Sequence, residues 1–117
     1  MSDPVAYKLV GRQEWETAIA NGPYGGSDVD RADGYIHLSG ADTLQETARK
    51  YYAGQTDLLL LAVDLDALGS TVVWEPSRDG ALFPHIYGSL PSSAVRNTRG
   101  LKVNDAGVMI FNDGAGL

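Results

Sequence analysis

The sequence predicts an α+β fold in which two N-terminal helices pack on a bent or split, mainly antiparallel sheet. Helical periodicity occurs in two stretches of the first half, and the rest of the chain consists mostly of short strand-like runs between turns. This segregation argues against a doubly wound parallel sheet. With 117 residues, 44% of them hydrophobic, the chain can bury one core, and we expect a single domain over residues 1–117.

The chain is expected to open with a strand and a helix. Residues 6–10, "AYKLV", have the apolar content of a strand, and residues 12–22 carry apolar side chains at helical spacing before an Asn-Gly stop. The next segment, "GPYGGSDVDRADG" (22–34), combines one Pro, four Gly and three Asp. It is expected to be a long loop, either functional or partly disordered.

A strand, a helix and a second strand are expected next. Residues 35–38, "YIHL", form a short strand, and residues 41–54 form the clearest helix, with Asp42 and Gln45 as a capping box. The apolar run "DLLLLAV" (57–63) is typical of a central strand, followed by a turn at 64–69.

The C-terminal half is expected to contain short strands joined by turns. The first two, at residues 71–75 and 82–88, flank a turn at 77–80. Pro84 cannot donate to a ladder, so it predicts an edge strand or a bulge. The further strands are expected at 94–98, 101–103 and 107–111, the last two joined by a turn at 104–107.

Composition excludes several classes of function. The chain has no cysteine, so disulfides, thiolate metal sites and cysteine nucleophiles are absent. The formal charge is −6 and the nine basic residues are scattered, which argues against broad nucleic-acid binding. No segment approaches the roughly 20 apolar residues of a membrane span, so we expect a cytoplasmic protein. The short strands and Pro84 are compatible with a monomer or a weak homodimer.

Both histidines of the chain lie in strand-like segments beside aromatic residues. Because side chains alternate along a strand, Tyr35, His37 and Ser39 share one face of the first segment. The second segment places three more side chains on one face, namely Phe83, His85 and Tyr87. Such rows can form the floor of a cleft that stacks a flat ring and binds its polar edge.

Glu75 closes the strand at 71–75 and is expected to meet a cleft lined by the histidines. Each of these residues also has a structural interpretation: a histidine whose nitrogens bind the backbone, or a solvated carboxylate at a strand end. Tyr51 and Tyr52 are explained by helix packing as well as by ligand binding.

The blocks "DGYIHLSG", "YYAG", "LLLLAVDLDAL", "WEPS" and "ALFPHIYGSL" resemble the family called domain of unknown function 952, over residues 7–95. The resemblance implies an ADP-ribosylation-like fold, which binds NAD in a cleft between two bent antiparallel sheets. It also implies that His37 and Ser39 hold a ribose and that a tyrosine stacks on nicotinamide. For that tyrosine, Tyr51 and Tyr52 compete with Tyr87.

The resemblance does not assign the late acidic residue of the fold's common pattern, and it gives no role to the second histidine. Glu75 is the candidate for the acidic residue that orients the acceptor or stabilises an oxocarbenium-like centre. His85 has no place in the common pattern; it is similar instead to the paired histidines of the RNA 2'-phosphotransferase branch, whose arginine partners have no clear match here.

We therefore expect a small-molecule cleft that takes NAD, ADP-ribose or a related ribose-phosphate, with His37, His85 and Glu75 as candidate catalytic residues. The alternatives are a non-catalytic binding module on the same fold, and an activity like that of the RNA 2'-phosphotransferases or of a two-histidine phosphoesterase. For the latter, "HLS" fits the required His-x-Ser/Thr element, whereas "HIY" has a tyrosine where that element needs a small hydroxyl residue. No local ligand spacing supports a metal site.

Overall fold

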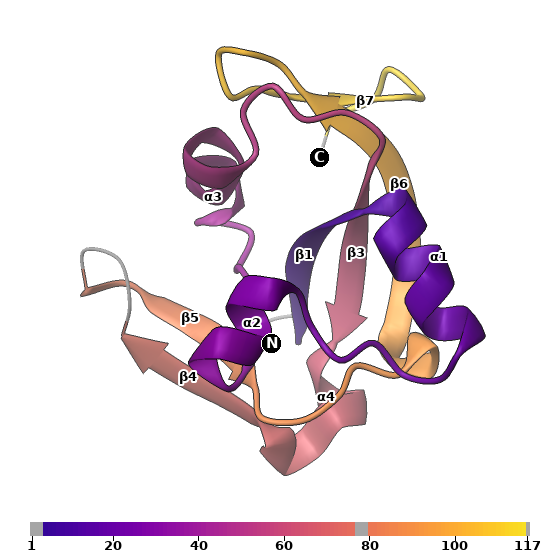
Figure 1. Ribbon diagram of the computed structural model, residues 1–117. Helices are drawn as coiled ribbons and strands as arrows, with labels where there is room; N and C mark the ends of the chain where they lie inside the picture. The colour runs from indigo at the N-terminus through magenta and orange to yellow at the C-terminus, as the bar shows by residue number, and fades with distance from the viewer. Residues whose placement is uncertain (1–3, 77–79, 117) are drawn as a thin grey trace.

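The computed structural model describes residues 4–76 and 80–116. It has the expected α+β class, with short helices placed around two sheets (Figure 1). The strands are β1 (Val5–Gly11), β2 (Ile36–His37), β3 (Leu58–Asp64), β4 (Val72–Pro76), β5 (Leu82–Ile86), β6 (Val95–Val103) and β7 (Met109–Phe111). The helices are α1 (Arg12–Ala20), α2 (Asp28–Asp33), α3 (Leu44–Tyr51) and α4 (Leu65–Leu68), with 3-10 turns at Gly69–Thr71 and Ser92–Ala94.

The strands form two separate sheets, as expected. The larger has the order β1-β3-β6-β7 and the smaller β2-β5-β4, and every neighbouring pair is antiparallel. One bridge joins the sheets: the backbone amides and carbonyls of Tyr7 and Ser39 exchange hydrogen bonds of 2.7 and 2.8 Å. This bridge holds the segment after β2 against β1.

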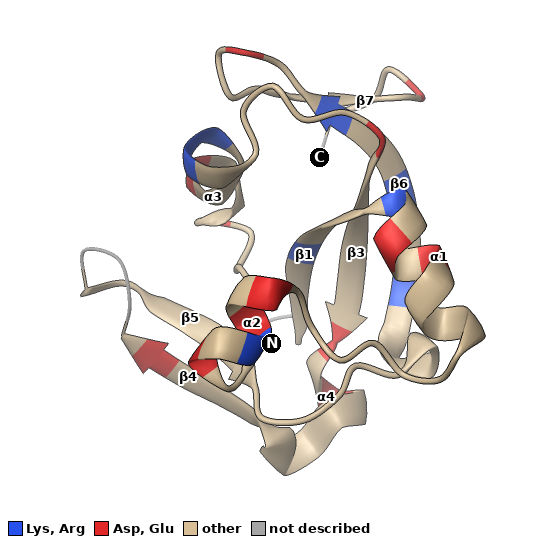
Figure 2. Cartoon of the chain, in the orientation of Figure 1, with Lys and Arg blue, Asp and Glu red and all other residues tan. Residues whose placement is uncertain are grey.

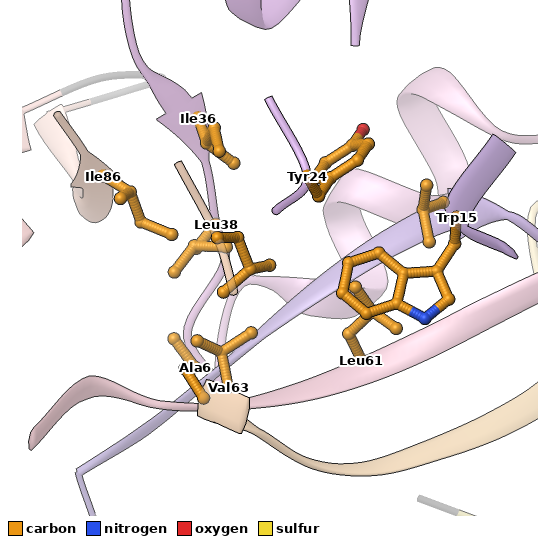
Figure 3. Close-up of a cluster of buried hydrophobic side chains, with 11 residues drawn as sticks. Ala6, Trp15, Tyr24, Ile36, Leu38, Leu61, Val63 and Ile86 are labelled. Carbon is orange, nitrogen blue, oxygen red and sulfur yellow. The ribbon is translucent and has the colours of Figure 1, made fainter. Parts of the chain in front are cut away.

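The main hydrophobic core lies between the two sheets (Figure 3). Ile36 and Ile86 of the smaller sheet meet Leu61 and Val63 of β3, and Trp15 of α1 closes one side. A second cluster, which includes leucines of β3 and β6, packs under α3 on the other face of the larger sheet. Burial of both faces explains the continuous apolar run of β3.

The segment at residues 22–34 is not a plain loop, because it contains α2. Ser27 caps this helix: its hydroxyl accepts from the Asp30 amide at 3.1 Å, and the Asp30 carboxylate accepts from the Ser27 amide at 2.9 Å. Gly34, at φ +91°, ends the helix in the left-handed conformation that glycine favours. The expectation of two helices thus missed α2, and it missed α4, which forms where a turn was expected.

The predicted capping box of the third helix is wrong. α3 begins at Leu44, so Gln45 lies one position too early to reach back to the cap. The N-cap is Thr43, and its side chain makes no capping bond to the helix; it donates to the carbonyl of Gly40 in the preceding turn at 3.3 Å.

The predicted edge position of Pro84 is also wrong, because β5 is the central strand of the smaller sheet. The Pro84 carbonyl accepts from the Leu38 amide at 3.0 Å. The Pro84 nitrogen, which has no hydrogen to donate, therefore faces the same segment of chain as this carbonyl does. The ladder between β2 and β5 stops there, after two residue pairs. The sheet therefore accommodates the proline where its partner strand ends.

The remaining expectations are mixed. Residues 94–98 and 101–103 were expected as separate strands, but β6 runs unbroken from Val95 to Val103. The turn at 104–107 is confirmed by the 2.9 Å bond from the Gly107 amide to the Asn104 carbonyl. The turn at 77–80 falls largely on residues 77–79, outside the described residues. None of the helices in the described ranges has the length and apolar character needed to cross a bilayer.

Candidate functional site

The two histidines lie directly opposite each other on neighbouring strands. His37 of β2 pairs with His85 of β5, and their ring centroids are 5.5 Å apart. The flanking Ile36 and Ile86 are buried in the core, which confirms the predicted alternation of faces. Both histidines line the same cleft.

Tyr35 joins the two histidines into an aromatic cluster. Its ring stacks on His85 with a centroid distance of 4.1 Å and an interplanar angle of 20°. The Tyr35 ring is tilted against the rings of His37 and Tyr87, with centroid distances of 4.8 Å and 5.2 Å. This contact holds the His85 ring in a fixed orientation.

His85 is buried and pairs with a partly exposed carboxylate. The residue is only 3% exposed, and its Nδ1 lies 2.7 Å from Glu75 Oε1. The same oxygen accepts from the Tyr87 hydroxyl at 2.7 Å. The hydrogen bond from His85, followed by that from Tyr87, lowers the pKa of Glu75, and the bond to Glu75 raises the pKa of Tyr87. A proton on Nδ1 directed at Glu75 leaves Nε2 as an acceptor.

His37 is held by a buried aspartate that sequence reasoning missed. Asp30 Oδ1 lies 2.6 Å from His37 Nδ1 and accepts from the His37 amide at 3.1 Å. Its other oxygen lies 3.0 Å from Lys8 Nζ and accepts from the Ser27 amide. Burial alone would raise the pKa of Asp30, but the bond to His37 and the Lys8 charge outweigh burial and hold that pKa far below its usual range.

Lys8 is the second residue that was missed. Its side chain is almost fully buried, and its Nζ donates to the His37 carbonyl at 3.1 Å as well as pairing with Asp30. Figure 2 shows this arrangement of charges on the fold, with a basic segment on β1 and acidic and basic segments on α2. The available signals were a lone lysine in an apolar strand and the "SDVD" capping pattern in the Gly-rich segment.

The other nitrogen of His37 meets a second carboxylate. His37 Nε2 lies 2.9 Å from Asp33 Oδ2, an ion pair when the imidazole is protonated. Asp33 is about half exposed, whereas Asp30 is buried. α2 therefore supplies one fixed and one accessible carboxylate to the same ring.

The cleft above the histidines has a volume of about 670 Å³. Its walls come from β1, the helices α1 to α3, and the β2 and β5 strands. Most of the predicted ligand-binding residues line it, namely Tyr35, Ser39, Tyr51, Tyr52 and Phe83. Glu75 and Tyr87 do not line the cleft; they contact His85 and each other.

The residues that line the cleft differ in how freely they can contact a ligand. Ser39 is buried, and its hydroxyl lies 3.0 Å from that of Thr47. The Tyr52 hydroxyl donates to the Leu9 carbonyl at 3.0 Å, and burial raises the pKa of Tyr52 to about 12. Tyr51 is 60% exposed at the rim. Among residues 4–76 and 80–116, no three His, Asp or Glu side chains are grouped to hold a metal ion.

Comparison with known proteins identifies the family. The family described as "Protein of unknown function (DUF952)" matches residues 9–98, and the chain belongs to it. The crystal structure of protein CC0527 from Caulobacter crescentus is similar, with a TM-score of 0.85 and 47% identity over 90% of this chain and 92% of that one. The solution NMR structure of CC0527 gives a TM-score of 0.76 and 44% identity over 95% and 90% of the two chains. A comparison with curated proteins found no match.

Proposed function

We propose that this DUF952 family member binds a small ligand in its cleft, one that carries a flat ring and a ribose, the class to which NAD and ADP-ribose belong. The observation that carries the proposal is the direct pairing of His37 and His85 in the floor of one cleft. A volume of about 670 Å³ is suited to a ligand of this size. The cleft takes lining residues from both antiparallel sheets, which supports the ligand class that the family resemblance implies.

The geometry favours particular roles for the predicted residues. The His37 side chain is one-third exposed and Asp30 fixes its Nδ1, so a ligand hydroxyl can approach Nε2 where that nitrogen meets the half-exposed Asp33. The exposed Tyr51 and its neighbour Tyr52 are better placed to stack on a ring than Tyr87, which does not line the cleft. Ser39 supports the wall through Thr47.

A thermal-shift and calorimetric titration with NAD, ADP-ribose and nicotinamide riboside tests the proposal. At least one of them should stabilise the wild type, and His37→Asn should bind it roughly 10-fold more weakly, a loss of about 1.4 kcal/mol. Asp42→Asn serves as the control, because Asp42 is exposed and outside the cleft. Equal binding by His37→Asn, or no binding to the wild type, would refute the proposal.

The His85–Glu75 pair favours a second candidate function, proton transfer at the bound ligand. A carboxylate on Nδ1 that leaves Nε2 as the acceptor is an arrangement that general bases use. Release of nicotinamide from NAD by the wild type but not by His85→Gln would support catalysis. Binding without turnover would identify a non-catalytic module. The phosphotransferase and phosphoesterase alternatives have less support, since no arginine of the described residues lines the cleft.

A further inference from the structure

We infer that the cleft holds the unphosphorylated part of such a ligand, an uncharged or cationic ring with its ribose, and disfavours phosphate, so that the phosphates of NAD or ADP-ribose would lie outside it. This inference rests on the proposed function and narrows its ligand class. It follows from the charges that line the cleft, from its aromatic walls and from the surroundings of the two histidines.

The charges of the cleft are predominantly acidic. Three carboxylates line it (Glu14, Asp30 and Asp33), and the lysine among the described lining residues is Lys8. Lys8 is neutralised by Asp30 at 3.0 Å, and both side chains are almost fully buried. A phosphate that entered the cleft would meet Glu14 and Asp33 without a free lysine or arginine from the described residues to offset its charge.

The arginines of the described residues are engaged elsewhere. Each of these arginines forms an ion pair with a carboxylate that lies outside the cleft. The pairs are Arg12–Asp57, Arg31–Asp28, Arg49–Glu46, Arg96–Asp64 and Arg99–Asp113. Phosphate sites are commonly built from arginine forks. The described part of this cleft has none.

The walls of the cleft favour a flat, neutral or positively charged ring. Six aromatic side chains line it, namely Tyr7, Tyr24, Tyr35, Tyr51, Tyr52 and Phe83. Aromatic faces attract cations, and nearby carboxylates add to this attraction. His85 lines the same cleft and is 3% exposed, and its Nε2 makes no hydrogen bond with another described residue. A buried acceptor of this kind fits a ligand hydroxyl.

Asp33 is the residue best placed to discriminate against a phosphorylated ligand. It lies 2.9 Å from His37 Nε2 and is about half exposed. An anionic group that approached His37 would be repelled by Asp33, whereas a ribose hydroxyl can donate to the same carboxylate. Asp33 would thus be a specificity residue with no catalytic role.

Two ligand pairs that differ by one phosphate test the inference: nicotinamide riboside against nicotinamide mononucleotide, and adenosine against AMP. Titration calorimetry at about 0.05 M salt should show the unphosphorylated member of at least one pair binding 10-fold or more tightly than its phosphorylated partner. Asp33→Asn should narrow this ratio several-fold, and Asp42→Asn should leave it unchanged.

The outcomes separate this inference from the proposed function. If the phosphorylated members bind as tightly or more tightly, the inference is overturned while ligand binding stands. If the ratio is present but Asp33→Asn does not change it, the role given to Asp33 is wrong. If no member of either pair binds the wild type, and NAD and ADP-ribose also fail, the proposed function itself falls.

Discussion

Asp30 is a buried anion with four hydrogen-bond donors around its carboxylate. Lys8, the ring and amide of His37, and the Ser27 amide all lie within 3.1 Å of its oxygens. A buried ion pair contributes little net stability against an apolar replacement, but removal of one partner leaves an uncompensated charge. Asp30 is therefore expected to be sensitive to substitution.

Asp30→Asn should lower the free energy of unfolding by about 3–5 kcal/mol, because it leaves Lys8 buried without a counter-charge. Urea denaturation followed by circular dichroism measures this change. Asp42→Asn, an exposed change, should stay within about 0.5 kcal/mol of the wild type. A loss below about 1 kcal/mol for Asp30→Asn would show that the Lys8–Asp30 contact is not formed in solution.

Acid should remove the stabilisation that the ionised Asp30 carboxylate gives to the folded wild type. The pKa of Asp30 is lowered in the folded protein from its ordinary value of 3.8, so the unfolded chain takes up the proton first. Its stabilisation is complete above about pH 5 and is lost as the pH falls through the ordinary value toward the folded one. The unfolding free energy of Asp30→Asn should therefore fall less steeply than that of the wild type between pH 5 and roughly pH 2. Parallel curves would contradict this assignment.

At the scale of elements, α2 is the part of the fold on which the site depends. It has six residues, too few to be stable alone, and it carries both carboxylates that face His37. Ser27 caps it, and Gly26 precedes it at φ +102°. A Cβ added at Gly26 would lie 2.8 Å from the Cβ of Asp30, so the chain needs glycine there.

Ser27→Ala should therefore cost about 1 kcal/mol of stability through loss of the cap. It should also shift the His37 ring signal in NMR spectra, because the cap positions Asp30. Ser93→Ala, at an exposed position in the 3-10 turn Ser92–Ala94, is the control. An unchanged His37 signal would show that Asp30 holds its position without the cap.

Part of this arrangement was predictable from local pattern and part was not. Alternation along "YIHLS" and "FPHIY" predicted which side chains share the histidine face, since a strand has a period of two. α2 was missed because glycines flank a helix of only six residues, which hides its periodicity.

The whole molecule is expected to unfold as one unit. The main core contains side chains of both sheets, and β1 and β3 contribute to the second core on their other face. A chain of 117 residues organised in this way should show two-state behaviour. Fluorescence, which reports on the buried Trp15 and the half-exposed Trp74, and far-UV circular dichroism should give coincident urea transitions. Separate transitions would show that the sheets fold independently, against the prediction of one domain.

Long-range pairing explains what the sequence could not predict at this scale. His37 lies opposite His85 because β2 and β5 are neighbours in the smaller sheet. The sequence shows two similar segments 48 positions apart, but it does not specify that they pair. The burial of Lys8 likewise depends on Asp30, a residue of another element. The expectation of an antiparallel split sheet is confirmed, and the binding of NAD remains a proposal.

The most direct test of the central claim is a long-range ¹H–¹⁵N NMR spectrum of the two imidazole rings during titration with nicotinamide riboside. The chain has only two histidines, so the variants His37→Asn and His85→Gln assign every ring signal. We predict that the His85 signals report a proton on Nδ1, and that the ligand shifts the signals of both rings with one saturation curve. Rings that titrate independently, or that ignore this ligand, NAD and ADP-ribose alike, would contradict the claim that the paired histidines form one binding site.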